Sequence, residues 1–407
     1  MNIVVASSGG PTSAINSSIA GVYLEATKHS NINKIYGALN GIEGILENRL
    51  VDLREQLGSG EDIDLLRLTP STVLGSCRYK LPKVEDDVSV YEEIISHFKE
   101  YDIGAFFYIG GNDSMDTVCK LSRYMSQNNI DIKAIGIPKT IDNDLMYTDH
   151  TPGFGSAAKY VAATIKEITR DSMVYSAKSV TIVEIMGRYA GWLAASSCVL
   201  RERGETAPHL IYLPEVPFST EKFVEDIKAK QKEHKAVIVA VSEGIKAEEG
   251  CYVAECYQSG ENDAFGHKYL SGVGKMLEDL VKKEIGCKVR SIELNVMQRC
   301  SSHIASKTDI DEAESIGSNA VLAALNGDTG KMMVFDRISD NPYRMEIKTV
   351  DVGGVANHVK YFPIEWINEE KNNIKDEAIQ YFLPLIQGEL SIKMDKGMPV
   401  HFRIKNI

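Results

Sequence analysis

The sequence predicts an α/β protein built on parallel, doubly wound sheets. Apolar runs of four to seven residues, rich in Val and Ile, recur along the chain. Each run ends in glycine or a polar turn, is followed by helix-like sequence, and does not alternate with polar residues. This pattern is typical of parallel strands that helices cover on both faces.

The expected strands follow one another in a regular order. They fall within the runs 3–6, 103–111, 132–138, 179–188, 209–215, 236–244 and 288–299. The polar, glycine-containing stretch 246–275 interrupts the rhythm, and we interpret it as an inserted loop or lid. Ligands bind beyond the carboxyl ends of strands in such sheets, so the polar ends of these runs mark the candidate site.

Composition narrows the choice of partners. The chain has 407 residues, 45 Lys and Arg, and 57 Asp and Glu, which gives a net charge of −12. At about 150 residues per domain this length predicts two or three domains. An acidic surface repels nucleic acid and anionic membranes, so a phosphorylated substrate would need cations gathered in one site, or a metal ion.

The N-terminus and the cysteines indicate in which cellular compartment the protein is expected. The start MNIVVASSGG has no basic region ahead of its apolar run, and no stretch reaches the ~20 apolar residues of a membrane helix. The seven cysteines form no CxxC pair, so the sequence predicts neither a disulfide framework nor a zinc site. We therefore expect a cytoplasmic protein with reduced thiols and no membrane contact.

Two glycine turns lead into helices. SSGGPTSAIN (7–16) would let backbone N–H groups approach an anion. IGGNDSMD (109–116) adds Asn112 and Asp113, which could hold Mg²⁺ against a polyphosphate or could simply cap a helix.

Two further segments carry candidate catalytic groups. In PKTIDND (138–144) a carboxylate could take the proton from an attacking hydroxyl, and Lys139 could neutralise a transferring phosphoryl group. In EIMGR (184–188) Arg188 could fork onto a phosphate. The plain alternatives are an Asx turn and a surface arginine. Other basic candidates are Arg78, Arg290 and Arg299.

Taken together, these segments resemble the 6-phosphofructokinase family. GGPTSAIN, GSCR, GGNDS, PKTIDND, EIMGR, LPEVPF, VSEG and an Arg-x7-Gln-Arg pattern occur in the family's order over about residues 1–350. The resemblance implies two Rossmann-like lobes with the active site in the cleft between them. Residues 1–154, completed by about 298–348, would bind the phosphate donor, and 155–297 would bind fructose 6-phosphate. Residues 349–407 would pack on both lobes as a tail.

The resemblance also implies roles for single residues. Asp142 would be the general base for the sugar 1-hydroxyl, and Arg188 would stabilise the transition state. The expected catalytic residues are Asp142, Arg188, Lys139 and Thr140. The expected fructose 6-phosphate site consists of Thr140, Asp142, Asp144, Met186, Gly187, Arg188, Glu243, Arg290 and Arg299. The expected donor site consists of Gly10, Arg78, Gly111, Asp113 and Lys139.

Departures from the family pattern indicate the donor. ATP-dependent members have Asp and Gly where this chain has Asn112 and Asp113, and Gly where it has Lys139. An aspartate at 113 adds bulk and negative charge where a nucleotide's α-phosphate would lie, and a lysine at 139 adds a cation near the transferred group. The chain thus looks like the pyrophosphate-dependent branch, whose reaction with fructose 6-phosphate is reversible. ATP-dependent phosphofructokinase, and less strongly a non-catalytic sugar-phosphate sensor, are the alternatives.

Metal and assembly are implied in the same way. We expect Mg²⁺ as cofactor, held by Asp113 with Asn112 as a possible second ligand. Arg290 would reach a neighbouring active site, which implies a homodimer or homotetramer. The family's histidine three residues before Arg299 is Val296 here, so that contact is lost or replaced.

Overall fold

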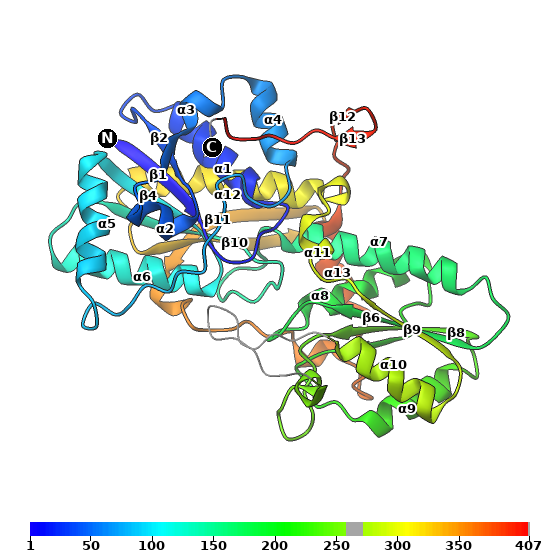
Figure 1. The fold of residues 1–407 in the computed structure, drawn as a ribbon. Helices are drawn as coiled ribbons and strands as arrows, with labels where there is room; N and C mark the ends of the chain where they lie inside the picture. Colours follow the sequence, from blue (N-terminus) through cyan, green and yellow to red (C-terminus); the bar gives the residue numbers. More distant parts are fainter. Residues whose placement is uncertain (258–271, 406–407) are drawn as a thin grey trace.

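The fold is taken from a computed structural model that describes residues 1–257 and 272–405. Residues 258–271 of the expected insertion 246–275 lie outside the described residues. Two sheets form two lobes, which lie side by side in Figure 1. The larger lobe is built on a seven-stranded sheet and the smaller lobe on a four-stranded sheet.

The sheet of the larger lobe has the strand order β11-β10-β5-β4-β1-β2-β3. Its strands are β1 (Asn2–Ser7), β2 (Ile35–Ala38), β3 (Leu50–Asp52), β4 (Ile103–Gly110), β5 (Lys133–Pro138), β10 (Lys331–Asp340) and β11 (Tyr343–Asp351). The pairs β1–β2, β1–β4, β4–β5 and β5–β10 are parallel, whereas the edge strands β3 and β11 run antiparallel to their neighbours.

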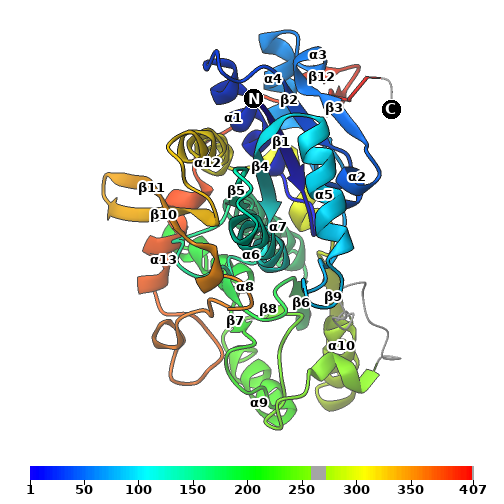
Figure 2. The same cartoon turned by 90° about the vertical axis from the view of Figure 1, so that its left-hand side faces the viewer.

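Helices cover both faces of this sheet. Neighbouring residues of β1 point to opposite faces, because side chains alternate along a strand. Ile3 and Val5 pack with α1 and α12, whereas Val4 and Ala6 pack with α2, α5 and α6. Figure 2 shows α12 and α5 on opposite sides of the strands. The helices of this lobe are α1 (Ile15–Thr27), α2 (Gly41–Leu46), α3 (Leu53–Gln56), α4 (Gly60–Leu68), α5 (Ser89–Glu100), α6 (Asn112–Gln127) and α12 (Lys307–Leu325).

The sheet of the smaller lobe is entirely parallel, in the order β7-β8-β6-β9. Its strands are β6 (Ser179–Ile185), β7 (Leu210–Tyr212), β8 (Ala236–Ser242) and β9 (Lys288–Glu293). One face packs on α7 and α8, and the other packs on α9 and α10. The helices are α7 (Phe154–Ser172), α8 (Trp192–Ala195), α9 (Thr220–Lys230), α10 (Val273–Glu284) and α11 (Met297–Cys300).

The tail after β11 runs along both lobes, as its orange-to-red trace in Figure 1 shows. Phe362 and Phe382 enter the core of the smaller lobe, and Phe402 enters a core of the larger lobe. Regular structure in the tail is short: α13 (Glu377–Phe382), β12 (Met394–Asp395) and β13 (Met398–Pro399). Short 3₁₀ helices along the chain are η1 (Ser196–Arg203), η2 (Val253–Tyr257), η3 (Ser302–Ile304), η4 (Val352–Gly354), η5 (Ile364–Trp366) and η6 (Leu383–Ile386).

The predicted α/β class with doubly wound sheets is confirmed, and every expected strand run contains a strand. The pattern missed β2, β3, β10, β11 and the two short tail strands β12 and β13. Residues of β11 alternate between half-buried and exposed, as in an edge strand with one face packed, so β11 lacks the continuous apolar run of a central strand. Within the described residues, no helix is both long and apolar enough to span a membrane.

Candidate active site

A cavity of about 390 Å³ lies where the carboxyl ends of the strands of both lobes meet. Thirteen of the predicted site residues line it, counted over the part of the chain that the structure describes: Gly10, Arg78, Gly111, Asn112, Asp113, Lys139, Thr140, Asp142, Asp144, Met186, Arg188, Glu243 and Arg299. They come from the ends of β1, β4, β5, β6 and β8, from the Gly75–Arg78 region and from α11. The cavity therefore lies at the edge of the sheets where ligands of such folds are expected to bind.

A buried lysine forms hydrogen bonds with the glycine turn after β1. Lys139 Nζ donates to the carbonyl oxygens of Ser8 at 2.9 Å and Gly10 at 2.6 Å. A Cβ on Gly10 would lie 2.7 Å from Arg299 Nη1, so only glycine lets this guanidinium come so close. The turn thus brings two cations against backbone at the edge of the cavity.

The loop after β5 carries the expected base. Asp142 N donates to Thr140 Oγ1 at 3.1 Å, and Thr140 O accepts from Thr151 Oγ1 at 2.7 Å. Asn143, the next residue, is buried and has a positive φ of 55°. These contacts fix the turn and leave the carboxylates of Asp142 and Asp144 on the cavity wall.

The loops after β6 and β8 form the opposite wall. Gly187 has φ of 136°, and its N–H donates to Glu243 Oε1 at 3.4 Å. Gly187 is not among the lining residues, although its neighbours Met186 and Arg188 are. Among the described residues, no hydrogen-bond partner faces the buried Nε of Arg188, and the Arg188 side chain lines the cavity, where an anionic ligand could contact it.

At the start of α6, Asn112 binds the tail. Asn112 Nδ2 donates to His358 O at 2.5 Å, and Asn357 N donates back to Asn112 Oδ1. Asn357 and Val359 consequently line the cavity beside Asp113. The amide of Asn112 is therefore engaged by the tail, and Asp113 is the better-placed candidate for a metal ligand.

The balance of charge in the cavity is positive near neutral pH. Burial, with repulsion from Asp142, raises the pKa of Glu243 to about 8 and that of Asp144 to about 7. Burial, with repulsion from Arg299, lowers the pKa of Lys139 to about 8, so most of its charge remains at pH 7. Burial also raises the pKa of Asp142, while Arg188 and Lys139 oppose that rise. Cations are thus gathered in one cleft of an acidic chain, as a phosphorylated substrate requires.

Two residues near the end of the smaller sheet lie away from the cavity lining. Arg290, on β9, is half-exposed and pairs with Asp171 at 3.3 Å. Val296, which stands where the family has histidine, is 48% exposed. Neither completes the cavity within one chain.

Sequence reasoning missed the part of the site supplied by the tail. Asn357 and Val359 line the cavity, but they lie in no motif and follow no expected strand. Their signal is purely spatial, because hydrogen bonds to Asn112 across 245 and 246 positions bring them there.

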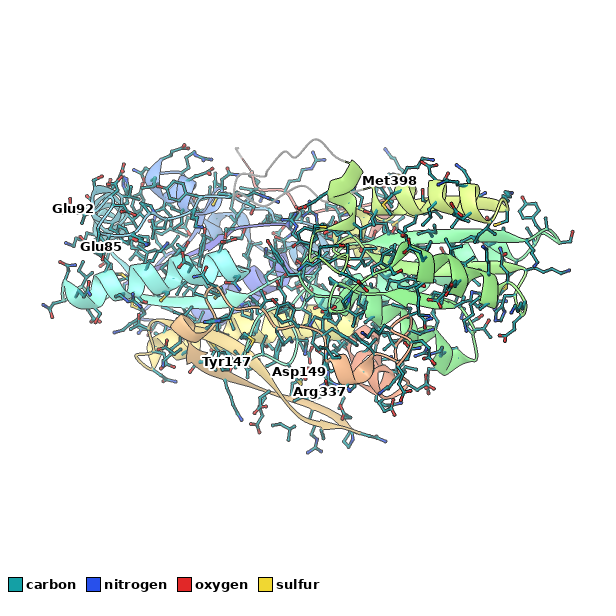
Figure 3. All side chains as sticks on the ribbon, turned by 90° about the horizontal axis from the view of Figure 1, so that it is seen from below. Glu85, Glu92, Tyr147, Asp149, Arg337 and Met398 are labelled. Atoms are coloured by element: carbon teal, nitrogen blue, oxygen red, sulfur yellow. The ribbon has the colours of Figure 1, made fainter. Side chains whose placement is uncertain are left out.

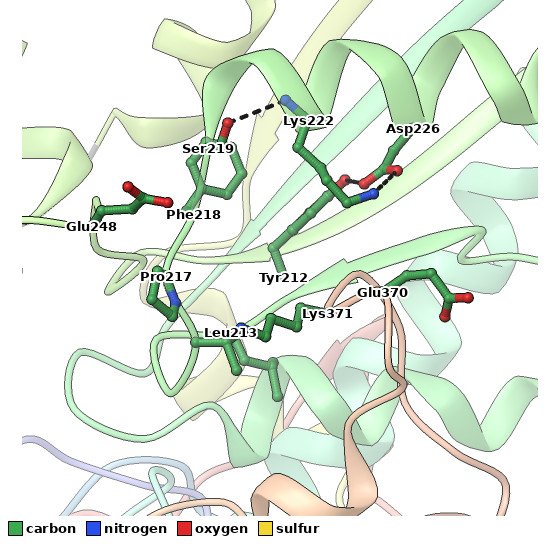
Figure 4. Close-up of a pocket in the computed structure, with 11 residues that line it drawn as sticks. Tyr212, Leu213, Pro217, Phe218, Ser219, Lys222, Asp226, Glu248, Glu370 and Lys371 are labelled. Carbon is green, nitrogen blue, oxygen red and sulfur yellow. Dashed lines mark hydrogen bonds and ion pairs between the residues drawn. The ribbon is translucent and has the colours of Figure 1, made fainter.

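A second cavity, of about 210 Å³, lies on the smaller lobe beside α9. Figure 4 shows Lys222 and Tyr212 both directed at Asp226. Lys222 Nζ donates to Asp226 at 2.8 Å and Tyr212 OH donates at 2.9 Å, so these charges and donors are already matched. This cavity lacks the converging cations of the first.

Comparisons with known proteins agree with this geometry. The family model for phosphofructokinase matches residues 2–324. A pyrophosphate–fructose 6-phosphate 1-phosphotransferase of Halomonas elongata is 39% identical over 98% of this chain and 94% of its own length. The enzyme of the same name from Methylococcus capsulatus is 39% identical over 100% and 96%.

A solved structure extends the agreement to three dimensions. The pyrophosphate-dependent phosphofructokinase of Marinobacter aquaeolei superposes with a TM-score of 0.88 at 38% identity, and the match covers 100% of this chain and 96% of that one. The two-lobed fold, the cavity at the strand ends and the sequence match therefore agree that the chain belongs to the phosphofructokinase family.

Proposed function

We propose that the protein transfers a phosphoryl group from pyrophosphate to the 1-hydroxyl of D-fructose 6-phosphate, as a reversible step of glycolysis. The products are fructose 1,6-bisphosphate and phosphate. The main observation in favour of pyrophosphate as the donor is the set of residues that line the cavity around Asp113. This carboxylate, Lys139 and the tail residues Asn357 and Val359 line one cavity, which suits a short phosphate donor better than a nucleotide. Full-length relatives whose names include pyrophosphate support the same donor.

The proposed reaction is an in-line displacement at the terminal phosphorus of pyrophosphate. Asp142 takes the proton of the sugar 1-hydroxyl while that oxygen forms the new O–P bond. The bridging P–O bond of pyrophosphate breaks, and its electron pair leaves with inorganic phosphate. Arg188 and Lys139 stabilise the charge that spreads over the transferred group, which is the main source of catalysis in phosphoryl transfer.

The remaining predicted residues are assigned to binding. Thr140, Asp144, Met186, Gly187 and Glu243 would position the sugar, and Arg299 would hold the 6-phosphate together with Arg290 of a neighbouring subunit. Gly10, Arg78 and Gly111 would contact the donor phosphates.

The donor set also fits a magnesium ion. One cavity carboxylate, Asp113, stands at the start of α6 beside the proposed pyrophosphate site. Protein-bound Mg²⁺ commonly takes only one or two carboxylates and completes its shell with phosphate oxygens and water. When bound, it would neutralise charge on the donor phosphates. Within residues 1–257 and 272–405, no group of three or more His, Cys, Asp or Glu side chains could hold a metal ion.

The proposed domain roles follow the two sheets. The donor lobe would comprise residues 1–154 completed by about 298–348, and the sugar lobe would comprise 155–297. The seven-stranded sheet supports the first assignment, because β10 joins β5 late in the chain. We also place the enzyme in the cytoplasm, because its buried cysteines Cys77 and Cys198 are free thiols.

The assembly is proposed to be a homodimer or homotetramer. Arg290 lies on the exposed edge strand β9 and lines a small hollow together with Tyr175, which is 54% exposed, and the preceding loop residue Val174 is 70% exposed. An exposed apolar patch of this kind is a common subunit interface.

A donor assay tests the proposal directly. Purified protein with fructose 6-phosphate and Mg²⁺ is expected to turn over with pyrophosphate and to run in reverse with fructose 1,6-bisphosphate and phosphate. Turnover with ATP but not with pyrophosphate would reject the donor assignment. Binding of fructose 6-phosphate without turnover by either donor would instead favour a sugar-phosphate sensor.

A further inference from the structure

Two side chains of the C-terminal tail, Lys360 and Tyr381, form hydrogen bonds with the loop after β5. This loop carries Asp142, and we call it the catalytic loop. The loop residue that they contact is Asn143, which stands between Asp142 and Asp144. Asn143 is fully buried and adopts a left-handed backbone conformation with φ of 55°. This conformation is uncommon outside glycine and persists where the surroundings hold it.

Both ends of the Asn143 amide are bound by the tail. Nδ2 donates to Tyr381 Oη at 2.8 Å, and Oδ1 accepts from Lys360 Nζ at 3.3 Å. Tyr381 OH donates in turn to Asp149 O at 2.6 Å. Lys360 Nζ donates further to Thr148 O at 3.0 Å and Asp149 O at 2.7 Å. The tail therefore ties the middle of the loop to its far end.

Lys360 also connects this loop to the smaller lobe. Its backbone N–H donates to Asp144 O at 2.8 Å, and its carbonyl accepts from Trp192 Nε1 at 2.9 Å. Its ammonium lies 4.8 Å from the centre of the Trp192 ring, within cation–π range. Lys360 thus contacts a loop of the larger lobe and a helix of the smaller lobe at once.

Tyr381 is itself fixed by an ion-pair network. Figure 3 shows Asp149 and Arg337 next to each other, and Arg337 Nη2 donates to Asp149 Oδ1 at 2.9 Å. The Arg337 guanidinium lies 4.5 Å from the centre of the Tyr381 ring and donates to the Tyr381 carbonyl. His150 donates to the same Asp149 oxygen at 2.9 Å. The hydroxyl that binds Asn143 is therefore held from several directions.

We propose that Lys360 and Tyr381 are positioning residues for phosphoryl transfer, which fix Asn143 and thereby aim the Asp142 carboxylate at the sugar hydroxyl. The proposal rests on the proposed role of Asp142 as general base. Neither side chain lines the cavity, so their effect passes through the loop. A displacement of about 1 Å in a catalytic group can cost on the order of 10²-fold in rate.

The test compares Lys360→Met and Tyr381→Phe with matched controls in the full chain. The controls are Lys375→Met and Tyr361→Phe, which change an exposed lysine and a 60%-exposed tyrosine of the same tail. We expect kcat to fall by about 10- to 100-fold in the test variants while KM for both substrates changes little, because geometry at the transition state is lost rather than binding. The controls are expected to match the parent enzyme.

A double variant adds a second measurement. Lys360→Met with Tyr381→Phe should lose less activity than the product of the two single losses, because both residues act on one amide. Thermal unfolding of each variant shows whether it is folded at the assay temperature. If Lys360→Met does not fold, Tyr381→Phe, which removes one oxygen atom, decides alone.

Folded variants with unchanged kcat, or with raised KM at constant kcat, would overturn the positioning role. All assays are run with pyrophosphate and with ATP. Activity of the parent enzyme with ATP alone would reject the proposed donor, but the ratio of kcat between variant and parent would still decide the roles of Lys360 and Tyr381.

Discussion

Lys139 serves both the fold and the proposed chemistry. Two of its three ammonium protons go to the carbonyls of Ser8 and Gly10, which leaves one for a ligand in the cavity. Burial and the nearby Arg299 guanidinium lower its pKa to about 8. A lysine with a lowered pKa is charged below that value and loses its charge as the pH rises through it.

The pH dependence of donor binding follows from this pKa. We expect kcat/KM for pyrophosphate to fall as the pH rises past about 8, because the free enzyme then loses the Lys139 cation. Steady-state kinetics between pH 6.5 and roughly 9.5 would measure it. Lys139→Met is the control: any decline that it retains comes from ionisation of pyrophosphate or of another group. A parent profile identical in shape to that of Lys139→Met would contradict the prediction.

Asp142 gives a second prediction at this scale. Asp142→Asn keeps the shape of the side chain but cannot accept the hydroxyl proton, so kcat should fall by about 10²- to 10⁴-fold with little change in KM. Asp64→Asn, at an exposed position of α4, is the matched control. A variant within about threefold of the parent kcat would show that another group takes the proton.

Much of the site could be predicted at the level of single residues. Asp142 and Arg188 follow apolar strands directly, and residues at strand ends meet at one edge of a parallel sheet. Lys360 could not be found in this way. Its partner Asn143 lies 217 positions earlier, and an isolated lysine in a tail gives no local pattern.

At the scale of elements, the first residue of α6 is hydrogen-bonded to the tail. The first residue of α6, Asn112, holds the tail at Asn357 and His358 through both ends of its amide. The next residue, Asp113, faces the cavity. The first turn of α6 therefore positions the tail through Asn112 and places the Asp113 carboxylate on the part of the cavity wall that we assign to the phosphate donor.

Releasing the tail should weaken donor binding. Asn112→Ala removes both hydrogen bonds, worth about 1–2 kcal/mol, so KM for pyrophosphate should rise by roughly 5- to 30-fold. KM for fructose 6-phosphate should change much less. Asn128→Ala, at the exposed C-terminal end of the same helix, is the control. An equal rise in both KM values would indicate that the substitution disturbs the whole cleft and not only the part of its wall that we assign to the donor.

The elements were predictable where their burial was uniform. Strands β4 and β8 are buried along nearly their whole length, so their apolar runs stand out in the sequence. The hairpin β10–β11 is half-exposed at the sheet edge, and β11 continues into a tail with little regular structure. Strand β11 alternates polar and apolar residues, as a half-exposed edge strand does, so it lacks the continuous apolar run by which the central strands were predicted.

At the scale of the whole molecule, the cavity of one chain lacks Arg290. This side chain stands on the outer strand β9 and pairs with Asp171 instead. In a two-fold symmetric dimer each subunit could lend its Arg290 to the other, since contacts across such an interface are reciprocal.

Hybrid enzymes would test this exchange. Asp142→Asn and Arg290→Met subunits should each be nearly inactive alone. Refolded together from denaturant in equal amounts, they should recover about a quarter of parent activity, because half of the dimers would hold one intact site. Each variant refolded alone is the control. No recovery would show that Arg290 acts within its own chain, and parent activity of Arg290→Met alone would show that Arg290 has no role.

The tail is the last part of the chain to be synthesised, and this affects when the active site can form. Both sheets are complete once β11 has left the ribosome, yet the wall at Asn357 and the grip of Lys360 on Asn143 come from residues made afterwards. Domains generally fold as they emerge. A nascent chain of this protein would thus hold the strands of two lobes around an unfinished catalytic loop, and translation that stops short of the tail would also leave out Phe362, Phe382 and Phe402 from the lobe cores.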